Sequence, residues 1–349
     1  MSSFGFGLIT AAVLAIAAVG FTMQFAVTNV LNLAYGSIMT NSAFVTYWVN
    51  AHGASIWISL FAGVACGAVV SWCLNRFIYT PFQRKNLPPI TLVIVSLGVN
   101  LIGTFGLQAI VGGSFVSYKM SQGPEFHILG MILSGVQLVI FGICAVVLVS
   151  IHWLLKYTRL GKAMRATSAN RNLARNSGVK TQFIISMTWV ISGALCGLAG
   201  TVFAMNSGVF EATSAEQYIV LLLAAMFLGG PGEPYGAMFG ALTIGLATEI
   251  SAAYIAADYK EVIAFLVLLG MLAFRPYGLF GARRRSNVTY LVRILSDHHS
   301  GVRRGGRAGL SGTQHAVWCG GNFQLRIHHL PGGRCLHGGD PVHAAGGNL

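Results

Sequence analysis

Charged residues are scarce in this 349-residue chain, which has only 9% Asp, Glu, Lys and Arg against 54% hydrophobic residues. None occurs between Met1 and Asn75. Soluble globular domains carry charge on about a quarter of their residues, so this composition excludes an ordinary water-soluble fold. It predicts a protein embedded in a lipid bilayer, where a charge in the hydrocarbon region is costly.

The motifs of several catalytic and binding classes are also absent. The chain has no G-x-x-x-x-G-K-[ST] loop for nucleotide phosphates, and neither H-E-x-x-H nor G-x-S-x-G occurs. Its six cysteines show no C-x-x-C spacing, so they indicate neither a disulfide framework nor a metal site. We therefore expect no catalytic residue, no metal and no cofactor in this chain.

The net charge of +13 is divided between short polar loops and an atypical C-terminal region. Basic residues of the loops cluster in three segments, 76–85, 156–180 and 275–285. The loops between them are weakly charged or acidic. By the positive-inside rule the basic segments are cytoplasmic, which places the N-terminus outside and the C-terminus inside. This distribution explains the charge without nucleic acid as a partner.

Apolar runs recur along the chain, and a helix of about 20 such residues can cross a membrane. We predict an all-α, polytopic transmembrane bundle of about eight or nine spans, one pair of which could be broken or re-entrant. The runs cover 4–27, 31–49, 55–78, 90–111, 129–155, 181–205, 218–228, 235–253 and 262–274. Small residues at i, i+4 and i+8 between Ser192 and Gly200 predict a close approach of two helices. The membrane domain would comprise residues 1–282.

Among the polar residues inside these runs, four are candidate functional residues: Asn32, Tyr35, Asn100 and Glu249. A buried amide without partners costs roughly 1 to 3 kcal/mol, so Asn32 should face protein or a water-filled path. Interhelical hydrogen bonds explain the two asparagines as well as a place on a transport pathway does. Glu249 is either a functional group or a carboxylate that reaches the lipid headgroups from near its helix end.

Gly229, Gly230 and Gly232 belong to a Gly-Gly-Pro-Gly-Glu-Pro sequence that interrupts an apolar region. Interrupted helices in transporters expose backbone groups at substrate or ion sites. A tight cytoplasmic turn is the alternative, and the parity of the predicted topology favours it.

Residues 160–179 form the one long polar, helix-compatible stretch between apolar spans. Seven basic and no acidic residues lie within 156–180, and orientation by the positive-inside rule would explain that charge alone. However, Gly178 supplies a C-terminal stop for a helix, and several residues can be arranged on helical faces, namely Ala163, Met164, Thr167, Leu173 and Ala174. We therefore predict a short cytoplasmic helix tethered to a span at each end.

Several motifs, in this order and spacing, together resemble one known family. They are Leu31-Asn-Leu-Ala-Tyr-Gly36, Gly161-Lys-Ala-Met-Arg-Ala-Thr167, Ser192-Gly-Ala-Leu-Cys-Gly-Leu-Ala-Gly200, Leu228-Gly-Gly-Pro-Gly-Glu-Pro-Tyr-Gly236 and Phe274-Arg-Pro-Tyr-Gly-Leu-Phe-Gly281. Over nearly all of residues 20–281 the chain resembles a permease subunit of the branched-chain amino acid ABC importers. That group also includes urea and amide permeases.

The resemblance implies that segment 156–180 is a coupling loop that docks on an ATP-binding subunit, with Gly161, Arg165, Ala166 and Gly178 in transmission. Asn170 stands where the family usually has an acidic residue, which places a specific salt bridge there in doubt but not the docking.

The partners that the resemblance implies are a second permease subunit, identical or different, cytoplasmic ATP-binding subunits, an external solute-binding protein and membrane lipid. ATP hydrolysis would belong to the separate subunits, and the complex would lie in the bacterial inner membrane. Two alternatives stay open: a stand-alone secondary transporter of a small solute, and the urea or amide version of the importer.

From residue 283 the composition changes to Gly, His and Arg, and this region holds seven of the ten histidines. A one-nucleotide shift of the reading frame over residues 322–338 allows codons for a sequence that resembles the early signature of the partner permease. We interpret residues 283–349 as a basic, disordered tail, produced by fusion to a neighbouring permease gene that is read out of frame after about Ser296.

Overall fold

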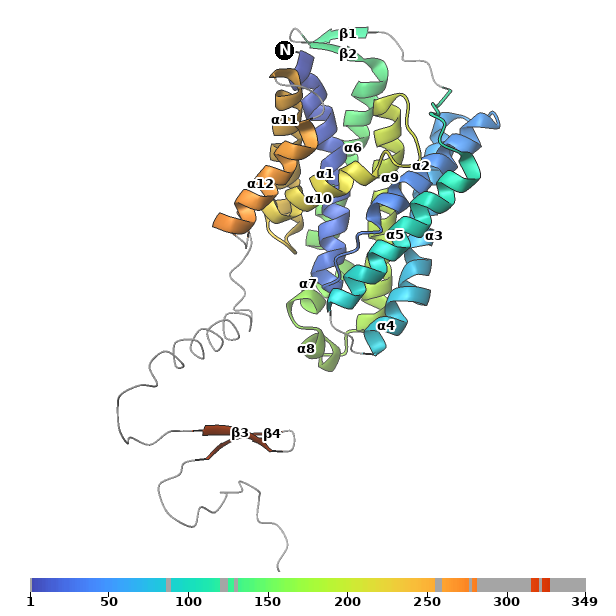
Figure 1. The fold of residues 1–349 in the computed structure, drawn as a ribbon. Coiled ribbons are helices and arrows are strands. Elements are labelled where there is room, and N and C mark those ends of the chain that lie inside the picture. The colour runs from blue at the N-terminus through green and yellow to red at the C-terminus, as the bar shows by residue number, and fades with distance from the viewer. Residues whose placement is uncertain are drawn as a thin grey trace, which may run out of the picture. The chain divides into compact units, whose positions relative to one another are not determined.

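The computed structural model describes residues 2–85, 89–119, 125–128, 131–254, 259–275, 278–280, 315–319 and 322–326. The chain divides into two compact units, Met1–Arg283 and Arg284–Leu349. Helices predominate among the described residues of the first unit (Figure 1). The helical class predicted from the sequence is therefore confirmed, with short β-hairpins as the departure from it.

The helices of the first unit follow the apolar runs of the sequence. Their bounds are α1 Ser2–Thr28, α2 Tyr35–Ala51, α3 Ile56–Cys73, the π-helix η1 Leu74–Tyr79, α4 Thr80–Arg84, α5 Pro89–Val111, α6 Gly135–Tyr157, α7 Arg159–Ala169, α8 Arg171–Asn176, α9 Thr181–Ser207, α10 Glu216–Gly229, α11 Pro234–Tyr254 and α12 Lys260–Phe274. The strands β1 Glu125–Ile128 and β2 Met131–Ser134 form an antiparallel hairpin in this unit.

Five helical stretches among the described residues are long and apolar enough to cross a membrane. They are Gly7–Thr28, Ile56–Gln83, Ile90–Val111, Gly135–Tyr157 and Thr181–Ser207. The shorter α10 is also apolar. The total of eight or nine spans and the orientation of the termini stay predictions.

The outer helices expose large apolar side chains. Phe61 on α3 is 72% exposed, and Ile102 and Ile110 on α5 are 76% and 85% exposed. Water-soluble monomers rarely expose continuous apolar patches of this kind, whereas lipid tails or another apolar subunit cover them at no cost. The surface therefore agrees with a membrane protein.

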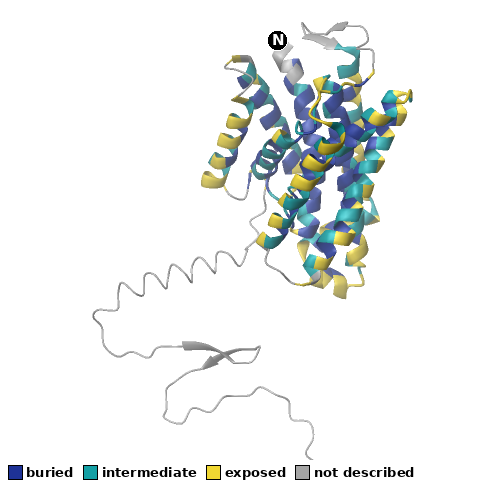
Figure 2. Cartoon of the chain, turned by 45° about the vertical axis from the view of Figure 1, so that its right-hand side comes forward, coloured by how far each residue is buried: buried dark blue, intermediate teal, exposed yellow. Residues whose placement is uncertain are grey.

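The centre of the unit is formed by α1 and α9. In the most apolar stretch of α1, 83% of the residues are buried, against 22% in the corresponding stretches of α5 and α6. Figure 2 shows the buried residues in the middle of the helical unit and the exposed ones on its outside. Elements that attach to α9 are thus connected to the core of the bundle.

The small residues of α9 permit close contact with α3. A Cβ atom added to Gly67 would lie 2.9 Å from Cα of Gly197 and closer still to the carbonyl oxygen of Gly193. Ser71 on α3 also donates its hydroxyl to the Trp189 carbonyl at 2.8 Å. The close helix approach predicted from Ser192 to Gly200 is confirmed, and its partners are glycines of α3.

Three helix boundaries differ from those predicted: the start of the second run, the end of the third and the start of the fifth. The second run begins as a helix only at Tyr35, because residues 29–34 are not helical and Asn29 has φ of 53°. The third helical stretch continues through η1 and α4 to Arg84, where we expected a loop from residue 81. Pro81 is tolerated in this continuation because it lies in the first turn of α4, where the missing N–H is not required.

The run predicted from residue 129 begins as a helix at Gly135, after the β1–β2 hairpin. Ser134 caps this helix: its hydroxyl accepts the Gln137 backbone N–H, and the Gln137 side chain accepts the Ser134 N–H. This reciprocal capping box explains the later start, and its Ser-x-x-Gln pattern is visible in the sequence.

In the second unit the structure describes β3 His315–Cys319 and β4 Asn322–Arg326, which pair as an antiparallel hairpin. The rest of the predicted tail, including the residues around Ser296, lies outside the described residues. The interpretation of 283–349 as an out-of-frame tail therefore stays a prediction.

Candidate functional site

Two helices, α7 and α8, lie at one end of the bundle in the segment predicted to couple the chain to a partner (Figure 1). Gly161, Met164 and Thr167 of α7 are buried, whereas Lys162, Arg165 and Ala166 are exposed. One face of α7 therefore packs on the bundle, and the opposite face presents positive charge and a small side chain to the exterior. The predicted division of this segment into helical faces is confirmed for α7.

The link between α6 and α7 is a tight corner at Thr158. Its hydroxyl accepts the backbone N–H of Gly161 at 3.1 Å and donates to the Leu154 carbonyl at 2.6 Å. Gly161 packs against the backbone of α6, since an added Cβ would lie 2.5 Å from the Leu155 carbonyl oxygen and 2.7 Å from its Cα. Only glycine fits this contact, so α7 is held firmly against the end of α6.

The other end of the pair joins α9 through Gly178. This residue has φ of 82°, and the N–H of Val179 donates to the Ala174 carbonyl at 3.0 Å. That bond spans the end of α8 in the manner of a Schellman motif, so the predicted helix stop at Gly178 is confirmed. Within α8 the side chain of Leu173 is 64% exposed, whereas Ala174 is buried.

Asn170 separates α7 from α8 and begins the second helix. Its side-chain oxygen accepts the N–H of Leu173 at 3.0 Å, which satisfies one of the free donors at the start of α8. Aspartate caps helices equally well. An acidic residue at this position would therefore serve the same local purpose, and the structure accounts for Asn170 without an ion pair.

The cap gives a first prediction. The substitution Asn170→Ala should weaken the start of α8 by about 1 kcal/mol, which corresponds to about fivefold faster hydrogen exchange of the amides in 171–176. The matched substitution Asn170→Asp should keep the exchange rates near those of the original chain. If Asn170→Asp exchanged as fast as Asn170→Ala, the capping role would be wrong.

Asn32 lies in the non-helical break between α1 and α2, and Tyr35 is the first residue of α2. Both residues are buried. Tyr79 of η1 donates its hydroxyl to Oδ1 of Asn32 at 2.8 Å. Tyr35 donates to the Ser192 carbonyl of α9 at 3.1 Å. These contacts match the interhelical hydrogen bonds that we weighed against a pathway role.

Asn100 supports the same break from α5. Its Oδ1 accepts the N–H of Ser37 at 3.1 Å in the first turn of α2, and its Nδ2 donates to Oε1 of Glu216 at 3.5 Å. One turn earlier, Ser96 accepts the N–H of Leu33 at 3.2 Å. The polar side of α5 therefore satisfies backbone groups that the break would otherwise leave unpaired.

Gly229, Gly230 and Gly232 form a tight turn between α10 and α11. Gly230 and Gly232 have φ of 117° and 91°, and Gly229 packs directly against Gly236. The Phe280 N–H donates to the Gly229 carbonyl at 3.0 Å. This geometry matches the tight-turn interpretation, and it places the turn next to the segment that follows α12.

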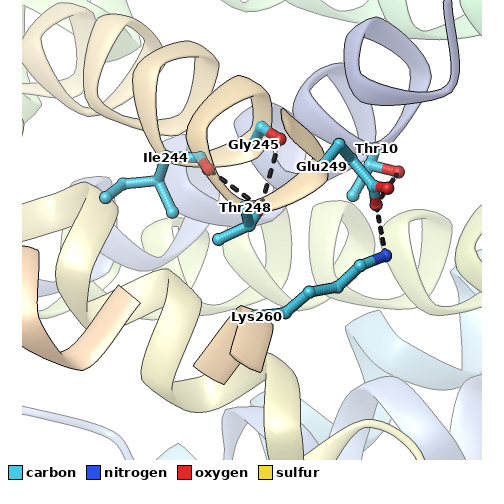
Figure 3. A network of polar contacts seen from close by, with 6 residues as sticks. All are labelled: Thr10, Ile244, Gly245, Thr248, Glu249 and Lys260. Atoms are coloured by element: carbon cyan, nitrogen blue, oxygen red, sulfur yellow. Dashed lines mark hydrogen bonds and ion pairs between the residues drawn. The ribbon is translucent and has the colours of Figure 1, made fainter. Parts of the chain in front are cut away.

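Glu249 is at the centre of a polar network near the end of α11 (Figure 3). Its Oε1 accepts a hydrogen bond from Nζ of Lys260 at 2.7 Å and another from the hydroxyl of Thr10 at 3.2 Å. The ion pair is partly buried, with side-chain exposures of 15% for Glu249 and 36% for Lys260. It connects the consecutive helices α11 and α12 with α1, which is more than 200 residues earlier in the sequence.

A cavity of about 510 Å³ lies beside this ion pair. Its lining combines charged, hydroxyl, amide and apolar side chains, namely Thr10, Phe203, Asn206, Ser207, Ser214, Gln217, Tyr218, Leu221, Thr248, Glu249, Lys260 and Glu261. The volume lies within the range of about 300 to 1,000 Å³ that is typical of small-molecule sites. Of the residues predicted to be functional, only Glu249 lines it.

The predicted residues thus fall into three places. Gly161, Arg165, Ala166, Asn170 and Gly178 lie on α7, α8 and their ends, while Asn32, Tyr35 and Asn100 surround the break before α2. Glu249 lines the cavity together with Asn206 and Ser207 at the end of α9, and α7 and α8 precede the start of that helix. Sequence reasoning missed Lys260, the partner of Glu249. The sequence does contain a signal for this pair. Glu249 lies near the end of one apolar run, and Lys260 lies just before the start of the next.

These features define a multi-pass membrane protein with a basic helix pair exposed at one end and a polar cavity at the other. The family model described as branched-chain amino acid transport system / permease component matches residues 3–272. The chain belongs to this family of ABC-importer permeases.

Individual relatives agree with that assignment. The chain is 25% identical over 282 residues to the high-affinity branched-chain amino acid transport system permease protein LivH of Escherichia coli (strain K12), covering 76% of this chain and 91% of that protein. It is 26% identical over 293 residues to BraD of Pseudomonas aeruginosa, with coverage of 79% and 94%. It is 27% identical over 298 residues to the probable LivH of Methanocaldococcus jannaschii, with coverage of 81% and 92%. These relatives are transport permeases and not enzymes.

Proposed function

We propose that this chain is the transmembrane permease subunit of an ATP-driven importer that moves branched-chain amino acids, or a related small polar solute, into the cytoplasm. Its partners would be a second permease subunit, cytoplasmic ATP-binding subunits and an external solute-binding protein, in a bacterial inner membrane. The branched-chain relatives support the substrate class, and the family supports the partners.

The observation that carries the proposal is the attachment of α7 and α8. Arg165 and Ala166 are exposed on α7, while Gly161 packs on the backbone of α6 and Gly178 leads directly into α9. A partner that moved this pair would move α6 and α9 with it. Because α9 lies in the core, such a displacement would reach the rest of the bundle.

The rival interpretation as a secondary transporter requires an ion-coupling site of its own. Glu249 was the candidate for that site, but it is paired with Lys260 at 2.7 Å. A carboxylate already neutralised by an ammonium group is a poor choice for binding a coupling cation. Proteoliposomes that take up solute without any ATP-binding subunit would favour the rival.

The urea or amide version of the importer would differ from this proposal only in its substrate. Competition between solutes during uptake distinguishes the two.

A charge reversal on the exposed face of α7 tests the proposal. The double substitution Arg165→Glu and Ala166→Glu should abolish co-purification of the ATP-binding subunits and reduce ATP-driven leucine uptake at least about tenfold, because like charge and bulk oppose docking. Since both side chains are exposed, the permease should still accumulate in the membrane. Lys119→Glu, a charge reversal at an exposed residue outside segment 156–180, is the control. Retained co-purification together with full uptake would defeat the assignment.

A further inference from the structure

The cavity beside Glu249 is lined by charged residues that have no part in the coupling proposed above. Three charged residues line it: Glu249, Lys260 and Glu261. Glu249 and Lys260 neutralise each other. Among the described residues no cation lies within ion-pair distance of Glu261, so the cavity offers one uncompensated carboxylate. This carboxylate favours a ligand with a positive group.

Lys260 supplies the complementary charge. Its ammonium group has three N–H donors, and one of them is directed to Glu249. Lys260 and Glu261 are consecutive residues in the first turn of α12, and both line the cavity. A positive and a negative group of one ligand can therefore be matched at the same time.

Part of the cavity lining is apolar. Phe203 of α9 and Tyr218 of α10 pack with ring centroids 4.4 Å apart, and Leu221 lies one turn further along α10. The neighbouring Asn206 adds an amide whose buried Oδ1 has no hydrogen-bond partner among the described residues. A small ligand in this cavity thus meets charged groups together with aromatic and aliphatic surface.

We propose that this cavity binds an α-amino acid with an apolar side chain, as a zwitterion whose ammonium group pairs with Glu261, whose carboxylate pairs with Lys260, and whose side chain contacts Phe203, Tyr218 and Leu221. This proposal rests on the proposed function, and it adds a site within the permease itself. Phe203, Asn206 and Ser207 of the lining belong to the last turns of α9, so the cavity lies at the end of α9 that is far from α7 and α8. Amino acid would therefore occupy it on the side of the bundle remote from the coupling helices.

Binding to the permease–ATPase complex, prepared without the solute-binding protein and without ATP, tests the site directly. Labelled L-leucine should bind saturably. 3-Methylbutan-1-amine, which keeps the ammonium group, should compete more weakly than leucine, and 4-methylpentanoate, which keeps only the carboxylate, should compete least. Glu261→Gln should weaken leucine binding about three- to tenfold, the modest range expected for an exposed charge. Glu261→Asp should recover part of that loss.

Glu233→Gln is the matched control, since Glu233 is an exposed glutamate in the turn before α11 and does not line the cavity. It should bind leucine like the original chain. The proposal is wrong if the complex shows no saturable leucine binding, if 4-methylpentanoate competes as well as leucine, or if Glu261→Gln and Glu233→Gln behave alike. ATP-driven uptake separates this failure from failure of the proposed function: a complex that imports leucine with an unchanged KM after Glu261→Gln keeps the function and loses the site.

Discussion

Replacing Gly161 by valine should reduce ATP-driven uptake at least about tenfold. The added side chain would meet the Leu155 carbonyl oxygen at 2.5 Å, and backbone atoms of a helix end cannot move aside as a flexible side chain would. Overpacking of this kind typically costs about 1 to 3 kcal/mol, so α7 should be displaced from α6. The measurement is leucine uptake by the assembled complex in proteoliposomes, together with ATP hydrolysis.

Gly142→Val is the matched control for this substitution. Gly142 lies in α6 as well, but an added Cβ meets nothing within 4 Å. It should preserve uptake. Hydrogen exchange in residues 158–169 gives a readout that does not depend on transport, and it should become faster in Gly161→Val alone. Uptake by Gly161→Val close to that of Gly142→Val would show that α7 tolerates displacement and that the tight corner is not needed.

The second large effect is expected at Gly67. Its Cβ position is occupied by the backbone of Gly193 and Gly197, so Gly67→Val should separate α3 from α9 in the core. We expect a loss of about 3 kcal/mol, the upper part of the usual range for overpacking, because both sides of the contact are backbone. Thermal unfolding of the purified permease, monitored through the loss of the monodisperse species, should show a clearly lower Tm.

Gly98→Val tests whether the effect comes from packing and not from valine in a membrane helix. Gly98 lies in α5, and an added Cβ there meets nothing within 4 Å. This variant should unfold at nearly the same temperature as the original chain. Equal Tm values for Gly67→Val and Gly98→Val would contradict the close contact between α3 and α9.

Much of the helical framework could be predicted because its signals are local. The apolar runs, the small residues from Ser192 to Gly200 and the glycine stop at Gly178 depend on neighbours within a few turns. The faces of α7 followed from helical periodicity for the same reason. In contrast, α8 has only six residues, too few for periodicity to decide which of Leu173 and Ala174 is buried.

The break before α2 could not be predicted, because its backbone groups are satisfied from a distant helix. Nothing near Asn32 indicates that Ser96 and Asn100, more than 60 positions later, accept the free N–H groups of Leu33 and Ser37. The pairing of Glu249 with Lys260 was missed for a related reason. Charge alone marked Glu249, whereas its partner depended on how α12 returns beside α11.

The support that α5 gives to this break also constrains how the chain is made. Residues 31–37 leave the ribosome long before Ser96 and Asn100 do, and an unpaired backbone group in lipid costs several kcal/mol. We therefore expect the nascent segment to settle in the bilayer less readily than α1, and to remain at the translocon or at the membrane surface until α5 has been synthesised. Insertion of α2 is thus coupled to a later helix, and truncation before residue 96 should leave residues 29–37 accessible to water-soluble probes.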